Sequence, residues 1–259
     1  MKHEPLKERY INPLTDFGFK KLFGTELNKV LLIDFLNQIL PKQHIIEELT
    51  YSNNAHLGKN EFDRKAIFDL YCTGQNGEKF IVEMQKAKQN FFKDRSVYYS
   101  SFPIQEQALK GDWNYQLQAV YTIGILDFKF DEHINDKDLL HVIELKNQKC
   151  EVFYDKLKFI YIELPKFTKK EDELVSHFDK WLYVFTHLQK LQDRPEKLQN
   201  RVFKRLFEIA EIAKFTPEER EAYQESLKHY RDIKNIVDTS KEEGKIEGLK
   251  EGKIEGLKE

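Results

Sequence analysis

The spacing of apolar residues divides the chain into a mixed first part and a helical second part. Apolar residues at helical spacing follow a cap at Thr15 or Asp16 and stop at Pro41, which predicts helical structure over 17–40. A second helix is predicted over 91–111, with a bend at Pro103 and an end at Gly111. Short apolar runs predict strands at 45–53, 65–72, 79–85, 117–126, 139–146, 150–154 and 156–164. This order of elements predicts an α/β body.

Beyond residue 168 every strong periodicity is helical. Two apolar stripes are most simply packing faces: Leu174, Phe178, Trp181, Phe185 and Leu188 in the first, and Val202, Leu206, Ile209 and Ile212 in the second. They predict two or three helices attached to the body, with a boundary near 165–170. We therefore divide the chain into a body (1–168), a helical segment (169–238) and a tail (239–259).

The tail repeats the eight residues EGKIEGLK, at 243–250 and again at 251–258. Its glycines recur at every fourth position, and each costs a helix about 1 kcal/mol relative to alanine. Pairing with a helix of another copy could offset that cost and would make the protein a homo-oligomer. The alternative is a frayed, solvated tail.

The hairpin KAIFDLYCTGQNGEKFIVEMQKAK at 65–88 places two acids among apolar residues. A two-residue loop would pair Asp69 with Val82 and separate Asp69 from Glu83. A three-residue loop at 75–77 ends in Gly77, the residue type that the left-handed position of such a loop favours. That register pairs Asp69 with Glu83, and the turn chemistry favours it.

Two carboxylates on adjacent strands lie about 5 Å apart and repel each other unless a cation or proton intervenes. Carboxylate oxygens are the ligands that Mg²⁺ or Mn²⁺ prefers. The hairpin therefore indicates a binding site for a divalent metal ion. The alternative is that both acids are solvated on an amphipathic hairpin, but apolar residues on both of its faces count against this.

Composition narrows the function classes. The chain of 259 residues has a formal net charge of −2, so any contact with nucleic acid requires a local basic patch. Two cysteines, Cys72 and Cys150, exclude a disulfide framework and a cysteine-rich zinc site. Forty per cent apolar residues can form a sizeable core. The start has no stretch like a signal peptide and no run is long enough for a membrane span, so we expect a cytoplasmic protein.

The sequence resembles the PD-(D/E)XK nuclease fold in three features: an acid on one strand, an acid-x-polar motif on the next strand, and flanking helices. More closely, TDFGFKKLFG, FDLYCTGQNGEKFIVEMQ, RSVYYSS and the terminal EG repeats resemble the recombination-promoting nuclease and putative transposase family. The resemblance implies a restriction-endonuclease-like mixed sheet flanked by helices, with a C-terminal helical segment. It covers about 10–165 closely.

Carried onto this sequence, the resemblance implies a catalytic and metal-binding set. Asp69 and Glu83 are the implied metal ligands, joined by the carbonyl of Met84, and Gln85 stands where the fold usually has a lysine. Gln belongs to this family's own pattern, so it does not indicate a dead enzyme. A neutral amide orients water or phosphate only through hydrogen bonds, which predicts slow chemistry that depends mainly on the metal.

Further residues complete the predicted site. Asp16 is the acid expected from the first helix, and a simple helix cap is its alternative role. The expected contacts to nucleic acid are Lys20, Lys21, Lys86, Lys88, Arg95, Tyr98 and Tyr99. Solvated lysines and packed tyrosines are the alternatives for this set.

The sequence thus predicts a metal-dependent endodeoxyribonuclease that uses Mg²⁺ or Mn²⁺ and acts on DNA. The resemblance links it to recombination, mobile elements or phage defence. Two alternatives stay open: a DNA-binding module with negligible catalysis, and an oligomeric interaction protein.

Overall fold

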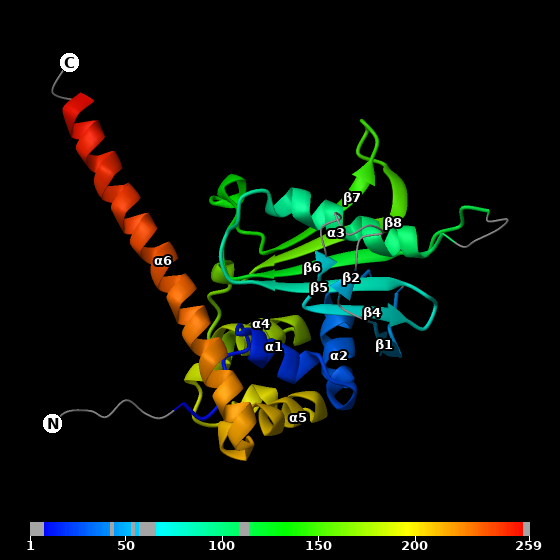
Figure 1. Cartoon of the computed structure of the whole chain (residues 1–259), viewed down its shortest axis with the longest axis horizontal. Helices are drawn as coiled ribbons and strands as arrows, with labels where there is room; N and C mark the ends of the chain where they lie inside the picture. The colour runs from blue at the N-terminus through cyan, green and yellow to red at the C-terminus, as the bar shows by residue number, and fades with distance from the viewer. Residues whose placement is uncertain (1–7, 42–43, 53–54, 57–65, 109–113, 256–259) are drawn as a thin grey trace.

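The computed structural model describes residues 8–41, 44–52, 55–56, 66–108 and 114–255. A mixed sheet lies at the centre with helices on both of its faces, and one long helix projects from the body (Figure 1). Among the described residues, no helix is both long enough and apolar enough to cross a membrane.

The central sheet has six strands in the order β1-β4-β5-β6-β8-β7. They are β1 (Leu49–Tyr51), β4 (Leu70–Gly74), β5 (Lys79–Gln85), β6 (Val120–Leu126), β7 (Leu140–Lys146) and β8 (Val152–Glu163). β6 runs parallel to β5 and β8, and the other pairs are antiparallel. Strands β2 (Ala55–His56) and β3 (Ala66–Ile67) form a separate two-stranded ribbon. The interior strand β6, buried along its whole length, confirms the strand predicted from the run at 117–126.

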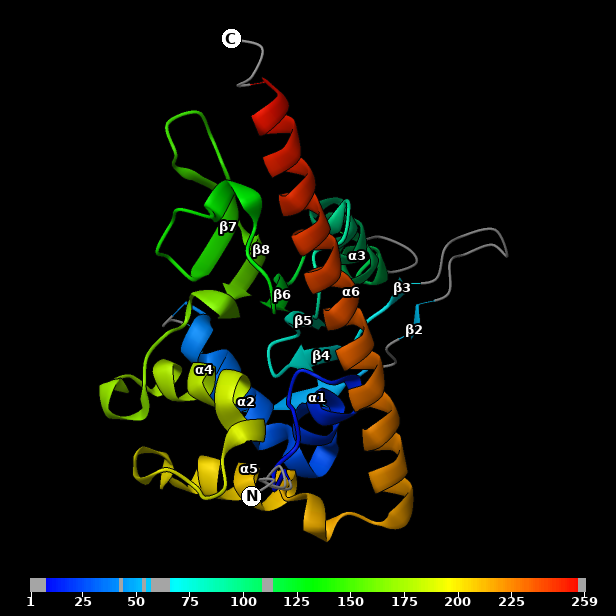
Figure 2. The same cartoon turned by 90° about the vertical axis from the view of Figure 1, so that its left-hand side faces the viewer.

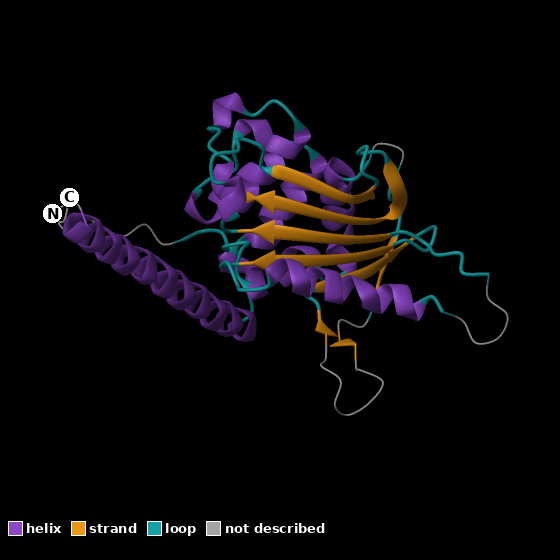
Figure 3. Cartoon of the chain, turned by 90° about the horizontal axis from the view of Figure 1, so that it is seen from above, coloured by secondary structure: helices purple, strands orange, loops and turns teal. Residues whose placement is uncertain are grey.

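Helices cover the two faces unequally. Helix α3 (Phe92–Glu106) lies on one face, and α1 (Asp16–Phe23), α2 (Lys29–Ile39), α4 (His177–His187) and α5 (Arg201–Ala210) lie on the other (Figures 1 and 3). The main hydrophobic core joins the second group to the sheet, with Phe23, Phe35 and Trp181 packed ring against ring. The helices of the predicted helical segment therefore share one core with the body.

Helix α6 (Pro217–Glu255) is the longest element. Its first turns pack into the core through Tyr223 and Leu227. It then runs past α1 and the ends of the central strands, and its last turns project beyond the body (Figures 1 and 2). Ile246 and Leu249 are exposed there. The described part of the predicted tail is thus helical, and residues 256–259 lie outside the described residues.

Several predicted boundaries are wrong. The single strand predicted at 65–72 is two strands, because the chain bends at Asp69 and sends Ile67 into β3. The strands predicted at 150–154 and 156–164 are one continuous strand, β8. Helix α3 ends at Glu106, before the predicted end at Gly111, which lies outside the described residues. Two helices, α1 and α2, replace the continuous helical stretch predicted at 17–40, and Gly24 ends the first of them.

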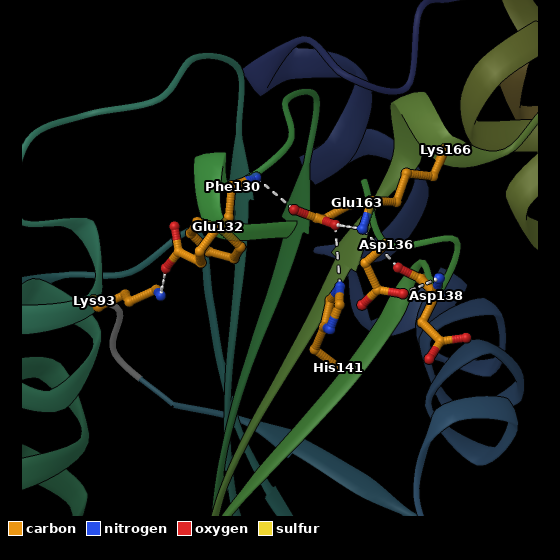
Figure 4. Close-up of polar contacts among 8 residues, drawn as sticks. All are labelled: Lys93, Phe130, Glu132, Asp136, Asp138, His141, Glu163 and Lys166. Atoms are coloured by element: carbon orange, nitrogen blue, oxygen red, sulfur yellow. Dashed lines mark hydrogen bonds and ion pairs between the residues drawn. The ribbon is translucent and has the colours of Figure 1, made fainter. Parts of the chain in front are cut away.

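A buried acid ties the end of β8 to its surroundings (Figure 4). The Glu163 side chain is fully buried and accepts a hydrogen bond from the Phe130 backbone N–H. His141 on β7 lies 3.0 Å from its Oε2, and the ammonium of Lys166 pairs with the same oxygen. Lys166 also donates to the carbonyl of Asp138 at 2.8 Å. This network fixes the loop that leads from β6 back to the sheet.

Candidate active site

The β4–β5 hairpin has the register that the turn chemistry predicts. Gly77 adopts φ +86°, and the Gly74 N–H donates to the Glu78 carbonyl at 2.8 Å across a loop of three residues. Leu70 pairs with Val82, and the same register continued by one residue sets Asp69 opposite Glu83. The prediction that the two acids meet on neighbouring segments is confirmed at the level of the backbone.

Asp69 occupies the bend immediately before β4. Its Oδ2 accepts a hydrogen bond from the Met84 N–H at 2.7 Å, and its own backbone N–H donates to the Glu83 carboxylate. Burial raises the pKa of Asp69, and the negative charge of Asp16 adds to that effect, whereas the Met84 hydrogen bond opposes it. The bend at Asp69, which breaks the predicted strand, thus allows the hydrogen bonds that hold the two acidic residues together.

Glu83 combines burial with incomplete hydrogen bonding. Its Oε1 is inaccessible to solvent and has no hydrogen-bond partner among the described residues. Burial and the nearby Asp69 charge raise the pKa of Glu83 to about 8, while Arg95 acts in the opposite direction. A buried polar atom without a partner costs the fold about 1–3 kcal/mol. Such an atom in a native site points to a ligand.

The donor set fits a hard divalent cation. Asp69 and Glu83 supply carboxylate oxygens and Met84 a backbone carbonyl, which are the groups that Mg²⁺ and Mn²⁺ bind. Such an ion would relieve the mutual repulsion of the two acids and would give Glu83 Oε1 the partner that it lacks among the described residues. Within the described part of the chain, no three His, Cys, Asp or Glu side chains are already gathered as a metal site. Asp16 therefore does not join the pair as a preformed third ligand.

Asp16 lies beside the pair without capping its helix. Thr15 is the cap, since its hydroxyl accepts a hydrogen bond from the Gly18 N–H at 3.0 Å. Asp16 is the first residue of α1 and forms an ion pair with Lys20 at 2.9 Å. A small cleft of about 190 Å³ joins it to the hairpin, lined by Asp16, Asp69, Met84, Gln85, Lys86, Ala87, Gln89 and Ile233.

A larger cleft of about 730 Å³ lies between α1 and α6. Lys20, Lys21 and Lys86 line it, and Lys86 also lines the small cleft. Burial lowers the pKa of Lys86, while Asp16 and Asp69 oppose that shift. Lys21 forms an ion pair with Glu219 of α6. Three of the four predicted lysines thus converge on one cleft, although acids offset the charge of two of these three.

The remaining residues predicted to contact nucleic acid differ in their surroundings. Lys88 forms an ion pair with Asp131, which lies in the loop after β6. Arg95 points to the site and donates from Nη2 to Gln85 Oε1 at 2.7 Å. Tyr99 packs edge-on against Phe68 and is partly buried, whereas Tyr98 is exposed. The contact between Arg95 and Gln85 was not predicted, because nothing in the sequence fixes which residue of α3 meets β5.

Helix α6 contributes to the site in a way that the sequence does not signal. Ile233 forms part of the wall of the small cleft. One turn before it, the Tyr230 hydroxyl donates to Asp127 Oδ2 at 2.8 Å, and Lys234 binds the same oxygen at 3.1 Å. These contacts fix α6 against the end of β6, and they give Asp127 a structural role.

A family model for PD-(D/E)XK nuclease family transposases matches residues 13–240. The chain belongs to this family. In this PD-(D/E)XK chain, the mixed six-stranded sheet with flanking helices and a C-terminal helix is the predicted restriction-endonuclease-like fold. Membership indicates a nuclease- or transposase-like function with DNA as substrate, in a family that generally uses divalent metals. Searches of curated proteins and of solved structures found no significant match.

Proposed function

We propose that the chain is a divalent-metal-dependent DNA endonuclease. The observation that supports this most directly is the pairing of Asp69 with Glu83, whose buried Oε1 has no partner among the described residues. Two acids at such close range destabilise the metal-free protein, so their placement favours function over packing. By the resemblance of the sequence motifs described above, the biological setting would be recombination, mobile elements or phage defence.

Each residue has a defined task in this proposal. Asp69, Glu83 and the Met84 carbonyl would hold Mg²⁺ or Mn²⁺, which would polarise the scissile phosphate and acidify a bound water. Gln85 orients the attacking water, whose oxygen bonds to phosphorus as the bond to the 3′ oxygen breaks. The 3′ oxygen takes up a proton, leaving a 5′-phosphate. Asp16 lies at the rim of the cleft as an accessory acid.

The basic residues and tyrosines would hold the DNA backbone. Lys20, Lys21 and Lys86 line the cleft beside the site, and Arg95 and Tyr99 lie at its α3 side. Lys88 and Tyr98 would contact DNA farther from the scissile bond. These contacts supply locally the positive charge that the whole chain lacks.

A plasmid-nicking assay tests the enzyme function. Wild type is expected to convert supercoiled plasmid to open circles with Mg²⁺ but not with a chelator. Asp69→Asn should slow this conversion at least about a hundredfold, because it removes a charged ligand. Asp94→Asn, an exposed acid on α3, is the matched control and should nick like wild type. Equal nicking by wild type and Asp69→Asn would overturn the proposal, and DNA binding without nicking would favour a non-catalytic binding module.

We also propose that the projecting part of α6 pairs with a second copy of the chain. A Cβ added to Gly244, Gly248 or Gly252 would meet nothing within 4 Å, and Ile246 and Leu249 are exposed nearby. Deleting residues 240–259 is expected to halve the mass measured by light scattering, while the remaining chain keeps its core contacts through Tyr223 and Leu227. An unchanged mass would show that the tail is not needed for assembly.

A further inference from the structure

Gln85 is held in one defined orientation although it carries no charge. Its side chain is buried, its Oε1 accepts a hydrogen bond from Arg95 Nη2 at 2.7 Å, and its Nε2 is 3.4 Å from the Ala87 carbonyl. A guanidinium group only donates hydrogen bonds, so the amide atom facing it must be the oxygen. The hydrogen bond from Arg95 therefore fixes the orientation of the Gln85 amide, with Oε1 toward Arg95 and Nε2 toward Ala87.

Arg95 is itself held from several directions. Its Nη1 donates to Gln89 Oε1, and its guanidinium lies 5.5 Å from the ring centre of Phe92 and 5.7 Å from that of Tyr99. The side chain is partly buried, and arginine keeps its charge at every pH at which proteins fold. A permanent positive charge is thus held against residue 85.

That charge also acts on the neighbouring acid. Glu83 is two residues before Gln85 on β5, so both side chains lie on the face that α3 covers. Arg95 therefore brings its positive charge to the face on which the Glu83 carboxylate lies. Two of the described lysines near the hairpin differ from Arg95 in their contacts, because Lys88 and Lys93 are paired with Asp131 and Glu132. Lys86, which is also among the described residues, lines the small cleft instead and has no contact with Gln85 that would orient the amide as Arg95 does.

We infer that Arg95, acting through Gln85, supplies the positive charge that a lysine at position 85 would supply in other nucleases of this fold. The inference rests on the proposed nuclease function. Arg95 is a positioning residue in this arrangement: it turns the Gln85 amide and offsets negative charge near Glu83. This role replaces the phosphate contact proposed for Arg95 above, which would predict a different result, a change in affinity for DNA.

The test compares Arg95→Gln, Gln85→Lys and the double variant with wild type, and uses Lys93→Gln as the matched control on the same helix. Arg95→Gln is expected to lower kcat for Mg²⁺-dependent nicking by about ten- to a hundredfold with little change in KM, as for other residues that orient a metal site. Lys93→Gln should match wild type. The double variant should recover most of the lost rate, because the lysine ammonium replaces the missing charge.

Calorimetric titration with Mg²⁺ alone provides a readout that does not depend on turnover. Removing a cation near the two carboxylates should tighten Mg²⁺ binding by about two- to tenfold in Arg95→Gln. A merely structural arginine would instead weaken Mg²⁺ binding and lower the unfolding temperature together.

The outcomes separate the two levels of the proposal. If wild type shows no nicking that depends on Asp69, the nuclease function fails and this inference with it. If wild type nicks and Arg95→Gln is as active as Lys93→Gln, only the role of Arg95 is overturned. A loss confined to KM, or no recovery in the double variant, overturns it as well.

Discussion

Glu83→Gln is expected to unfold at a higher temperature than wild type above pH 8 and to nick no DNA. The wild-type carboxyl is buried, lies opposite Asp69, and has one oxygen without a hydrogen-bond partner in the described part of the chain. Its ionised form is therefore costly in the folded state. Because an amide has a similar shape and no charge, Glu83→Gln does not have the free-energy cost of burying a charge. It also lacks the charge that would bind the metal, so its activity is lost.

The sign of the pH dependence follows from the raised pKa. The unfolded chain releases the Glu83 proton near the ordinary pKa of 4.5, whereas the folded chain holds it up to about pH 8. As pH rises between these values the folded state binds more protons than the unfolded state, so wild type loses stability. The loss is complete above pH 8, and we expect it to be about 2–3 kcal/mol after partial relaxation of the site.

Thermal unfolding in the presence of a chelator measures the difference in stability between wild type and Glu83→Gln at each pH. At pH 4 the wild-type carboxyl is largely protonated in both the folded and the unfolded state, so the two unfolding temperatures should nearly coincide, which provides an internal control. Adding Mg²⁺ should raise the wild-type unfolding temperature alone, since only wild type binds the ion tightly. A variant that is less stable than wild type at every pH would show that the Glu83 carboxylate serves packing instead of metal binding.

Glu163→Leu is expected to destabilise the fold by about 3–5 kcal/mol, because it leaves a buried charge without its partner. The Lys166 side chain is 4% exposed and pairs with Glu163, and the Phe130 N–H also loses its acceptor. Urea unfolding at pH 7 measures this loss. Glu132→Gln, which removes an acid from the exposed pair with Lys93 in the same region (Figure 4), should cost less than about 1 kcal/mol.

The same network predicts an acid-sensitive contribution to stability. Burial alone would raise the pKa of Glu163, but hydrogen bonds from Lys166, Phe130 and His141 outweigh burial and hold it below 4.5. Its stabilisation is therefore present above that pH and is lost as pH falls through the lower folded pKa. Glu163→Gln should show a weaker acid destabilisation than wild type. An unchanged pH profile would mean that other carboxylates dominate acid unfolding.

The sequence predicted what depends on local chemistry. Gly77 sits where a three-residue loop needs a left-handed residue, and this alone determined that Asp69 faces Glu83. The run that becomes β6 is apolar on both faces, as an interior strand between two helical layers must be. Family membership and fold class followed from the hairpin and the elements around it.

What could not be predicted depends on contacts between distant segments. The strand predicted at 65–72 breaks because Asp69 turns to accept the Met84 N–H and Ile67 pairs with a strand outside the hairpin. Strand β8 reads as two runs because its first half is largely exposed and its second half buried. The contact of Arg95 with Gln85 requires the position of α3 over the sheet, which no local pattern specifies. The roles of the site residues remain predictions for the experiments above.

Helix α6 is continuous from Pro217 to Glu255, a length of about 58 Å at 1.5 Å per residue. Tyr223 anchors it in the core, Ile233 forms part of the cleft wall, and Leu249 lies far outside the body. A stiff rod held in this way behaves as a lever with its fulcrum near Tyr230 and Lys234, which bind Asp127. Any partner that displaces the outer arm would load these contacts and the adjacent cleft wall at Ile233, so we expect mechanical force on the tail to reach the proposed active site.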